Sequence, residues 1–145
     1  MEKLAFKDFA PNTIFDFGYA SVSEQEIIDF ALFFDPIDFH TNKEFAERSM
    51  FGALVASGPQ LFKIFHLRNW LPLFKDTILA GMELNWKFLK PIYADMKVFC
   101  KVIIIDIKPD YEKKRAIVKW HFDFTNEIGD LLQTIDVTML HSTVN

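Results

Sequence analysis

Two short segments in the first half of this chain carry the residue types that do proton chemistry. The first, Phe34–His40, reads Phe-Asp-Pro-Ile-Asp-Phe-His and sets the carboxylate of Asp35 five positions before the imidazole of His40. The second, Phe51–Gly58, ends in a Ser-Gly pair directly before a proline. An imidazole that titrates near neutral pH, beside a carboxylate, can move a proton to or from a bound water. We interpret the two segments as parts of one enzyme active site.

His40 taken alone would more often be an ordinary hydrogen-bonding residue of a loop. Asp35 favours a catalytic role, because it comes at the end of an expected helix, where the negative end of the helix dipole disfavours its charge. Pro36 also disfavours helical geometry for Asp35. A carboxyl group kept at such a place suggests a polar partner, and His40 is a suitable one.

Gly58 has two interpretations that the sequence leaves open. It is either a simple helix cap or the backbone N–H donor of an oxyanion site, because a helix N-terminus presents unpaired N–H groups and partial positive charge. Such a donor suits negative charge that develops on a thioester carbonyl oxygen. Ser57 could contribute its hydroxyl group or simply cap the helix.

Three helices are expected to position these residues. A capping box at Ser23-Glu24-Gln25-Glu26 and apolar residues at helical spacing predict a helix over about 23–34. A short helix is expected over 42–48, with Asn42 as its cap and Phe45 facing inward. A buried apolar helix should begin at Ser57 or Gly58, with a proline in its first turn, and end before Pro72.

Beyond that helix the apolar period changes from 3.6 to 2, which predicts half-buried antiparallel strands. The alternations fall in 82–88, 98–104, 116–124 and 135–139, and a first strand is expected near 13–22. We predict a single α+β domain over residues 1–145 whose curved sheet wraps the apolar helix, the hot-dog arrangement. Pairing of its exposed edge strands across a two-fold axis would give a homodimer or a dimer of dimers.

Composition excludes several classes of protein. The chain has 145 residues, half of them hydrophobic and 17 of them Phe, which suggests an aromatic core or an acyl-binding surface. A formal net charge of −4 argues against nucleic acid as a partner. The longest strongly apolar run, 102–105, is too short for membrane insertion, and with no signal-peptide pattern at the N-terminus we expect a cytoplasmic protein. Cys100, the single cysteine, should be a small buried residue.

Both segments of the first paragraph resemble the hydratase signature of the MaoC-like acyl dehydratases. The resemblance is to the branch with an Asp-Pro-x-Pro-Phe-His core and a Phe-Gly-Gly-Leu-x-Ala-Ser-Gly block, and the strand pattern with Trp86 and Pro91 is also similar. It covers nearly the whole chain. It implies a hot-dog (R)-specific enoyl-CoA hydratase, or the same reaction run as a 3-hydroxyacyl dehydratase.

The resemblance also implies the roles of individual residues. Asp35 and His40 would activate water and handle the α-carbon proton, while the Gly58 N–H would polarise the thioester carbonyl. Ser57, Phe39 and Phe51 are expected to contact the substrate. No separate cofactor is expected, since coenzyme A or a carrier protein enters as part of the acyl-thioester substrate.

The chain departs from the branch pattern at three places. Asp38 replaces a proline and either raises the basicity of His40 or faces solvent, which we favour. Ala53 replaces a glycine. Pro59-Gln60-Leu61 replaces Trp-His-Thr and should alter a wall near the acyl pocket, which leaves the preferred chain length open.

The remaining polar residues give weaker signals. His66 and His121 are expected to be structural or exposed, and His141 is given no role. No zinc-site spacing and no Gly-rich phosphate loop occurs. Eight basic residues could meet the phosphates of coenzyme A: Arg48, Lys63, Arg68, Lys87, Lys90, Lys113, Lys114 and Arg115. The alternatives to a hydratase are a hot-dog thioesterase and a non-catalytic acyl-thioester-binding dimer.

Overall fold

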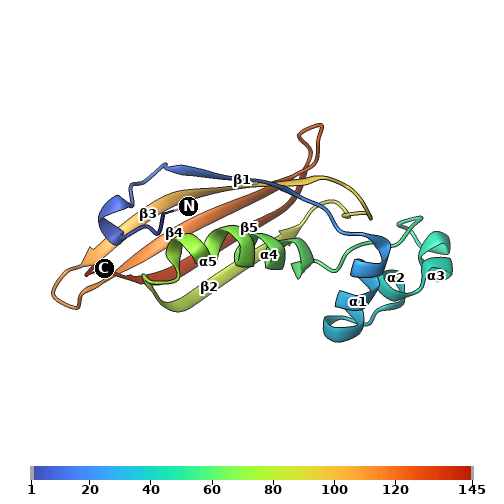
Figure 1. Cartoon of the computed structure of the whole chain (residues 1–145), viewed down its shortest axis with the longest axis horizontal. Helices are drawn as coiled ribbons and strands as arrows, with labels where there is room; N and C mark the ends of the chain where they lie inside the picture. The colour runs from blue at the N-terminus through green and yellow to red at the C-terminus, as the bar shows by residue number, and fades with distance from the viewer. Residues whose placement is uncertain (1, 145) are drawn as a thin grey trace.

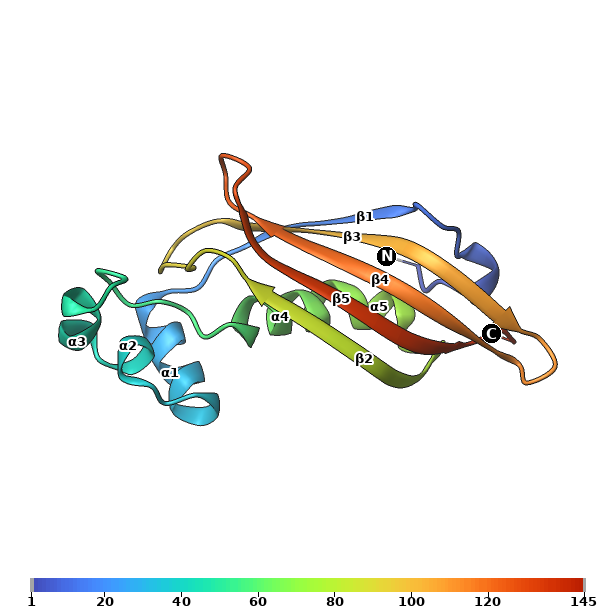
Figure 2. The ribbon, with the colours of Figure 1, turned by 180° about the vertical axis from the view of Figure 1, so that it is seen from behind.

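A computed structural model, which describes residues 2–144, contains a five-stranded antiparallel sheet in the order β1-β3-β4-β5-β2 (Figures 1 and 2). The four strands predicted from the alternation of apolar residues and the expected first strand are all present. Their bounds are β1 Ile14–Ala20, β2 Ile78–Phe88, β3 Val98–Asp110, β4 Arg115–Thr125 and β5 Leu131–Ser142.

The helices fall between β1 and β2 and form two groups. At one end of the sheet lie α1, α2 and α3, while α4 and α5 run along the sheet itself (Figure 1). Their bounds are α1 Glu24–Phe34, α2 Asp38–Thr41, α3 Lys43–Arg48, α4 Pro59–Phe65 and α5 Leu71–Phe74, with a π-helical turn over His66–Trp70 between the last two. A short 3-10 turn, Phe6–Asp8, precedes β1. The α+β hot-dog architecture is confirmed.

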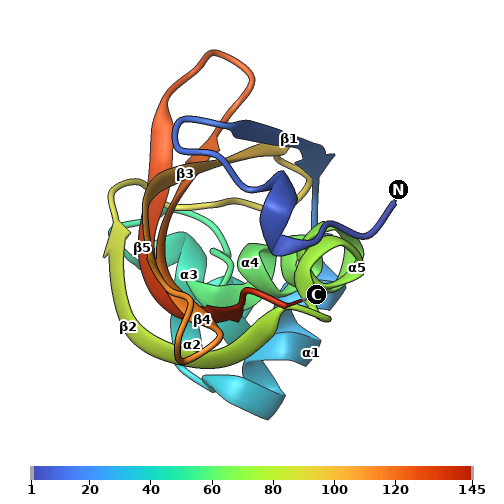
Figure 3. The ribbon, with the colours of Figure 1, turned by 90° about the vertical axis from the view of Figure 1, so that its left-hand side faces the viewer.

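The sheet curves around α4 and α5 because both surfaces carry large apolar side chains (Figure 3). On the concave face of the sheet, the alternating residues of β3 and β4 are buried, and Trp120 lies edge-on to Trp70 of the helical segment with ring centroids 4.5 Å apart. Phe65, Phe74 and Phe124 are also fully buried. Burial of aromatic rings of this size dominates the stability of such a core.

The predicted end of the central helix before Pro72 is wrong. Helical structure continues through this proline to Phe74, and the π-helical turn just before it makes this possible. The Leu71 N–H donates to the carbonyl of His66 in a wider turn than an α-helix has. Pro72 then occupies the first turn of α5, where a missing N–H costs little.

Two predictions of side-chain burial are also wrong. Phe45 of α3 is 44% exposed, and its neighbour Ala46 fills the inward position instead. β2 was expected to be half-buried, yet most of its residues are exposed on both faces, Met82 and Leu84 among them. The reason is that β2 lies at the edge of the sheet, where β5 is its only neighbouring strand among the described residues.

Across residues 2–144, the structure has no helix whose length and apolar character would let it cross a lipid bilayer.

Candidate active site

Asp35 lies at the C-terminal cap of α1. The capping box at the other end of this helix is present, with the Ser23 hydroxyl accepting from the Glu26 N–H, so the predicted helix start is confirmed. Before Pro36 the backbone of Asp35 leaves helical geometry (φ −154°, ψ 74°), as the proline rule predicts. Its side chain therefore projects from the helix end instead of lying along the helix surface.

His40 lies on α2, one helical turn that begins just after Pro36. The residue is only 5% exposed, and its Nδ1 lies 2.6 Å from the Val55 carbonyl oxygen. A carbonyl can only accept, so Nδ1 carries the hydrogen and donates it. In the neutral imidazole Nε2 is then left without a proton, with a free lone pair.

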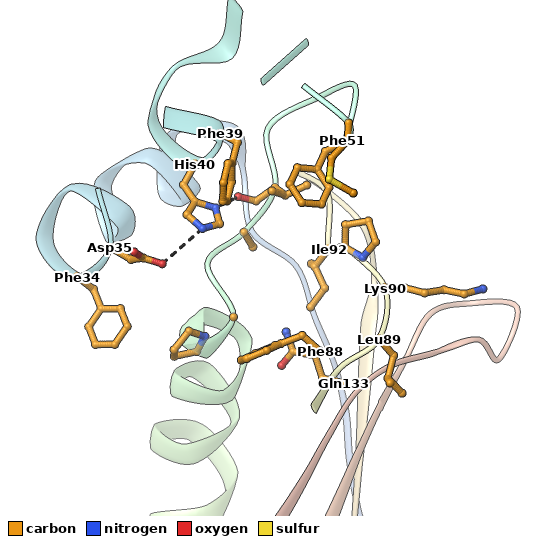
Figure 4. A pocket seen from close by; sticks show the side chains of 16 residues that line it. Phe34, Asp35, Phe39, His40, Phe51, Phe88, Leu89, Lys90, Ile92 and Gln133 are labelled. Carbon is orange, nitrogen blue, oxygen red and sulfur yellow. Dashed lines mark hydrogen bonds and ion pairs between the residues drawn. The ribbon is translucent and has the colours of Figure 1, made fainter. Parts of the chain in front are cut away.

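The Nε2 atom of His40 faces the Asp35 carboxylate across 3.5 Å, the contact drawn as a dashed line in Figure 4. Two acceptors at this separation do not bond directly when the imidazole is neutral, but both can hold the protons of one water. Ser57 donates its hydroxyl to the same carboxylate oxygen of Asp35, over 3.3 Å. The structure therefore brings the predicted pair of Asp35 and His40 together, and Ser57 contacts the Asp35 carboxylate.

Gly58 immediately precedes α4 and lies beside the ring of Phe88 from β2. A Cβ atom at position 58 would come within 2.2 Å of Phe88 Cε1, so only glycine permits this approach. Among residues 2–144, no backbone carbonyl or side chain accepts a hydrogen bond from the Gly58 N–H. That donor remains available at the N-terminal end of the helix, as predicted.

A cavity of about 640 Å³ joins these groups, a volume ordinary for a small-molecule site (Figure 4). Asp35, His40 and Gly58 all border it. Its walls are mainly apolar and come from four parts of the chain: the end of α1 and α2, the loop before α4, the end of β2 with the residues that follow, and β5. Apolar side chains on these walls include Phe34, Phe39, Phe51, Phe88, Leu89 and Ile92.

The three residues expected to contact substrate have different positions. Phe39 and Phe51 line the cavity, with their ring centroids 5.3 Å apart. Ser57 is fully buried and does not line it. Its hydroxyl also makes no capping bond to α4, which has no side-chain cap. The structure thus places Ser57 against Asp35, where it orients the carboxylate, and not against a substrate.

The departures from the family pattern leave the Asp35–His40 pair intact. Asp38 is exposed, as we favoured. Pro59 lines the cavity, whereas Gln60 is buried away from it and donates from Nε2 to the Glu26 carbonyl oxygen over 3.0 Å. That bond ties α4 to α1, the helix that carries Asp35.

The other histidines lie outside this cavity. His141 is completely buried between Thr77 and Trp120, and burial lowers its pKa to about 4. Burial also lowers the pKa of His66, which is half-buried. His121 lies on the outer face of the sheet; burial alone would lower its pKa, but hydrogen bonds to two aspartates, at positions 136 and 123, raise it.

Cys100 is buried in β3, as expected, and burial raises the pKa of its thiol. No group of three or more His, Cys, Asp or Glu side chains within residues 2–144 is arranged to hold a metal ion.

Of the cavity residues in the second half of the chain, sequence reasoning named Lys90 as a candidate, among eight basic residues, and missed others, Phe88 and Gln133 among them. Phe88, Lys90 and Gln133 belong to β2, its exit and β5, far in sequence from Asp35. For Phe88 a signal existed, because it continues the apolar alternation of β2. Gln133 gave none, because only the pairing of β5 with β2, which sets Gln133 opposite Phe88, brings it to the cavity.

Comparison with known proteins supports both the fold and the family. No protein-family model matches the chain. The uncharacterized protein YdeM of Bacillus subtilis is 33% identical over 105 residues, which span 70% of this chain and 74% of YdeM. A MaoC-like dehydratase from Rhodospirillum rubrum superposes with a TM-score of 0.83 at 26% identity, covering 96% of this chain and 97% of that one.

An (R)-hydratase from A. caviae, involved in PHA biosynthesis, superposes with a TM-score of 0.73 at 20% identity, covering 92% of this chain and 97% of that protein. At this identity the likeness bears on the fold alone. Together the curved sheet and the central helix define a hot-dog protein. The chain belongs to the MaoC-like family, which includes dehydratases and (R)-hydratases.

Proposed function

We propose that this protein is an acyl-thioester hydratase/dehydratase. It adds water to trans-2-enoyl thioesters to form (R)-3-hydroxyacyl thioesters, or it catalyses the reverse reaction. The observation that supports this most is the convergence of Asp35 and His40 on one apolar cavity, with the Gly58 N–H on its border. The acyl chain would lie against the aromatic walls.

The chemistry follows from the two acceptors. His40 Nε2 and the Asp35 carboxylate both accept hydrogen bonds from one water on their cavity side, and they remove a proton from it as its oxygen bonds to the β-carbon. Electrons of the carbon–carbon double bond move onto the thioester oxygen as an enolate, which the Gly58 N–H stabilises. The pair then returns the proton to the α-carbon. One water molecule has then been added across the double bond, and Asp35 and His40 have returned to their starting protonation states.

Fixed hydrogen bonds suit the pair to this task. The bond from His40 Nδ1 to the Val55 carbonyl sets the tautomer, and the Ser57 hydroxyl orients the carboxylate of Asp35. Neither residue needs to reorganise when substrate binds, and such preorganisation lowers the barrier.

The coenzyme A or carrier protein attached to the acyl group would extend from the mouth of the cavity into solvent. Lys90 lines the cavity, is exposed, and forms a surface ion pair with Asp130 over 3.0 Å. Exposed pairs of this kind are weak, so Lys90 is free to exchange its partner for a phosphate of coenzyme A.

We also propose a homodimer. β2 is an edge strand that exposes Leu79, Met82 and Leu84, more apolar surface than an isolated edge normally leaves uncovered. Pairing β2 with its copy would satisfy the backbone groups of this edge and bring these side chains against those of the partner strand. Analytical ultracentrifugation should find a dimer that Leu84→Lys weakens; a monomer at micromolar concentration would contradict the proposal.

A direct test supplies crotonyl-CoA and longer trans-2-enoyl-CoAs to the wild-type protein and follows the loss of enoyl absorbance. Chiral analysis should identify the (R)-3-hydroxyacyl product. Release of free thiol without a hydroxyacyl product would instead indicate a thioesterase. Binding by calorimetry with no turnover would indicate the non-catalytic alternative.

A further inference from the structure

Gln133 of β5 is a polar residue in the otherwise apolar wall of the cavity. It is only 3% exposed, and it lies across the strand pair from Phe88, which approaches Gly58. Figure 4 shows its amide beside the Phe88 ring, with the nitrogen turned toward the part of the cavity that His40 borders. An amide in such surroundings is unfavourable unless its donors find an acceptor.

The orientation of this amide is fixed by Trp86. The indole Nε1–H donates to Gln133 Oε1 over 3.1 Å, and because an indole N–H can only donate, the oxygen must be the atom on that side. Gln133 Nε2 therefore carries two N–H donors on the opposite side. Within residues 2–144, no acceptor takes a hydrogen bond from Nε2, nor is this nitrogen sealed off from solvent.

The position of Gln133 in depth points to the acyl part of a ligand. Met50 and Phe34 are 92% and 56% exposed and form the rim of the cavity, whereas Gln133, like His40, is nearly inaccessible and lies across the cavity from His40 (Figure 4). A coenzyme or carrier protein must remain outside the rim because of its size. With the β-carbon at Asp35 and His40, the rest of the acyl group extends across the cavity toward Gln133.

We infer that Gln133 is a specificity-determining residue that donates a hydrogen bond from Nε2 to an oxygen on the acyl group, beyond the β-carbon. The preferred substrates are then enoyl or hydroxyacyl thioesters whose chain carries a keto or hydroxyl oxygen, and not plain alkyl chains. This inference rests on the proposed function for its choice of thioester substrates. It adds the chemical class of the acyl group.

The test uses the full-length protein and matched pairs of trans-2-enoyl-CoAs. Each pair has one chain length, with and without a keto oxygen, and the oxygen is moved along successive carbons past the β-carbon. Steady-state kcat/KM is measured for the wild type and Gln133→Met, which keeps the size and removes the donor. Trp86→Phe serves as a control that retains Nε2 but frees the amide to rotate.

We expect the wild type to favour the oxygenated member at one position by about tenfold, the usual effect of one hydrogen bond. Gln133→Met should abolish that preference by lowering kcat/KM more for the oxygenated member than for the alkyl member, and Trp86→Phe should reduce it. Equal rates for both members at every position, or an equal loss for both in Gln133→Met, would overturn the inference.

A parallel calorimetric titration separates this inference from the proposed function. Saturated acyl-CoAs, with and without the keto oxygen, need no turnover to report a preference. If the wild type hydrates nothing but still binds the oxygenated thioester about tenfold more tightly through Gln133, the proposed reaction fails and the inference stands. If hydration occurs with no preference in either assay, the inference alone fails. If no acyl-CoA binds, both fail.

Discussion

Two buried histidines at opposite ends of this molecule show what separates a catalytic imidazole from a structural one. His40 is 5% exposed and His141 is fully buried, and both have a polar group within reach of each ring nitrogen. The partners differ. His141 lies between the Thr77 hydroxyl and the Trp120 indole, which are both uncharged.

His40 instead faces a carboxylate and a cavity. Its Nε2 has the Asp35 oxygen at 3.5 Å, so one water on the cavity side of the pair can donate to both atoms, and apolar walls continue from there. At His141 the Trp120 N–H donates directly to Nε2 over 3.1 Å, so no lone pair is left for a substrate. Burial alone therefore does not mark function; a free lone pair beside a cavity does.

The largest expected effect separates the two histidines by activity. We predict that His40→Asn lowers the kcat for enoyl-CoA hydration by about a hundredfold to ten-thousandfold, because a general base is removed. His141→Gln should keep wild-type kcat in the folded fraction. Steady-state kinetics with circular dichroism on the same samples checks both. Equal losses of activity in the two variants would remove the distinction between them.

The second effect separates the histidines by stability and has a defined pH window. The pKa of His141 is about 4 in the fold, against an unfolded value near 6.5. As pH falls below 6.5, His141 binds a proton in the unfolded chain but stays neutral in the folded protein. Stability is therefore lost between pH 6.5 and 4. The loss would approach about 3 kcal/mol at the lower limit.

Urea unfolding at pH 7 and pH 4.5 measures this loss. The His141→Gln variant should be less stable than the wild type at pH 7 but should lose less stability on acidification. An identical pH dependence in the two proteins would show that His141 does not control it.

A smaller effect is expected at Gly58. A methyl group in Gly58→Ala would meet the Phe88 ring at 2.2 Å and push it out of its place in the cavity wall. We expect kcat/KM to fall by about tenfold to a hundredfold, since small displacements near the reacting atoms are costly. Adding Phe88→Leu should restore part of the loss. Losses that simply add in the double variant would argue against this contact as the cause.

The smallest effect is expected at Ser57. Ser57→Ala removes the hydroxyl that donates to Asp35, and we expect kcat to fall by about three- to tenfold, because a hydrogen bond of 3.3 Å is long for a hydroxyl donor and therefore weak. Ser142→Ala, which changes a buried serine far from the cavity, is the matched control. Its kcat should remain at the wild-type value. An unchanged kcat in Ser57→Ala would show that Asp35 needs no such support.

Local rules predicted those parts of the molecule that depend on neighbouring residues. The capping box fixed the start of α1, Pro36 turned Asp35 out of the helix, and period-2 alternation located the strands. These are short-range effects of backbone geometry and apolar patterning. The same reasoning placed Asp35 and His40 near one another, because only one turn of chain separates them.

The remaining features depend on contacts between distant segments. Gln133 reaches the cavity only through the register of β5 with β2, which no local pattern reveals. Ser57 was expected at a helix cap or substrate, but its hydroxyl meets a carboxylate 22 residues away. Helical structure continues past Pro72 because a π-helical turn precedes it. The continued helix is stabilised by packing of Trp70 and Phe74 against Trp120.

A double-mutant cycle on enoyl-CoA hydration tests most directly whether Asp35 and His40 act as one proton-transfer unit. The kcat of Asp35→Asn, His40→Asn and the double variant would be compared with that of the wild type. Residues that act together lose their function together, so the double variant should be no slower than the slower single variant, within about threefold. Losses that multiply in the double variant, or wild-type activity in either single one, would contradict a shared role for this pair.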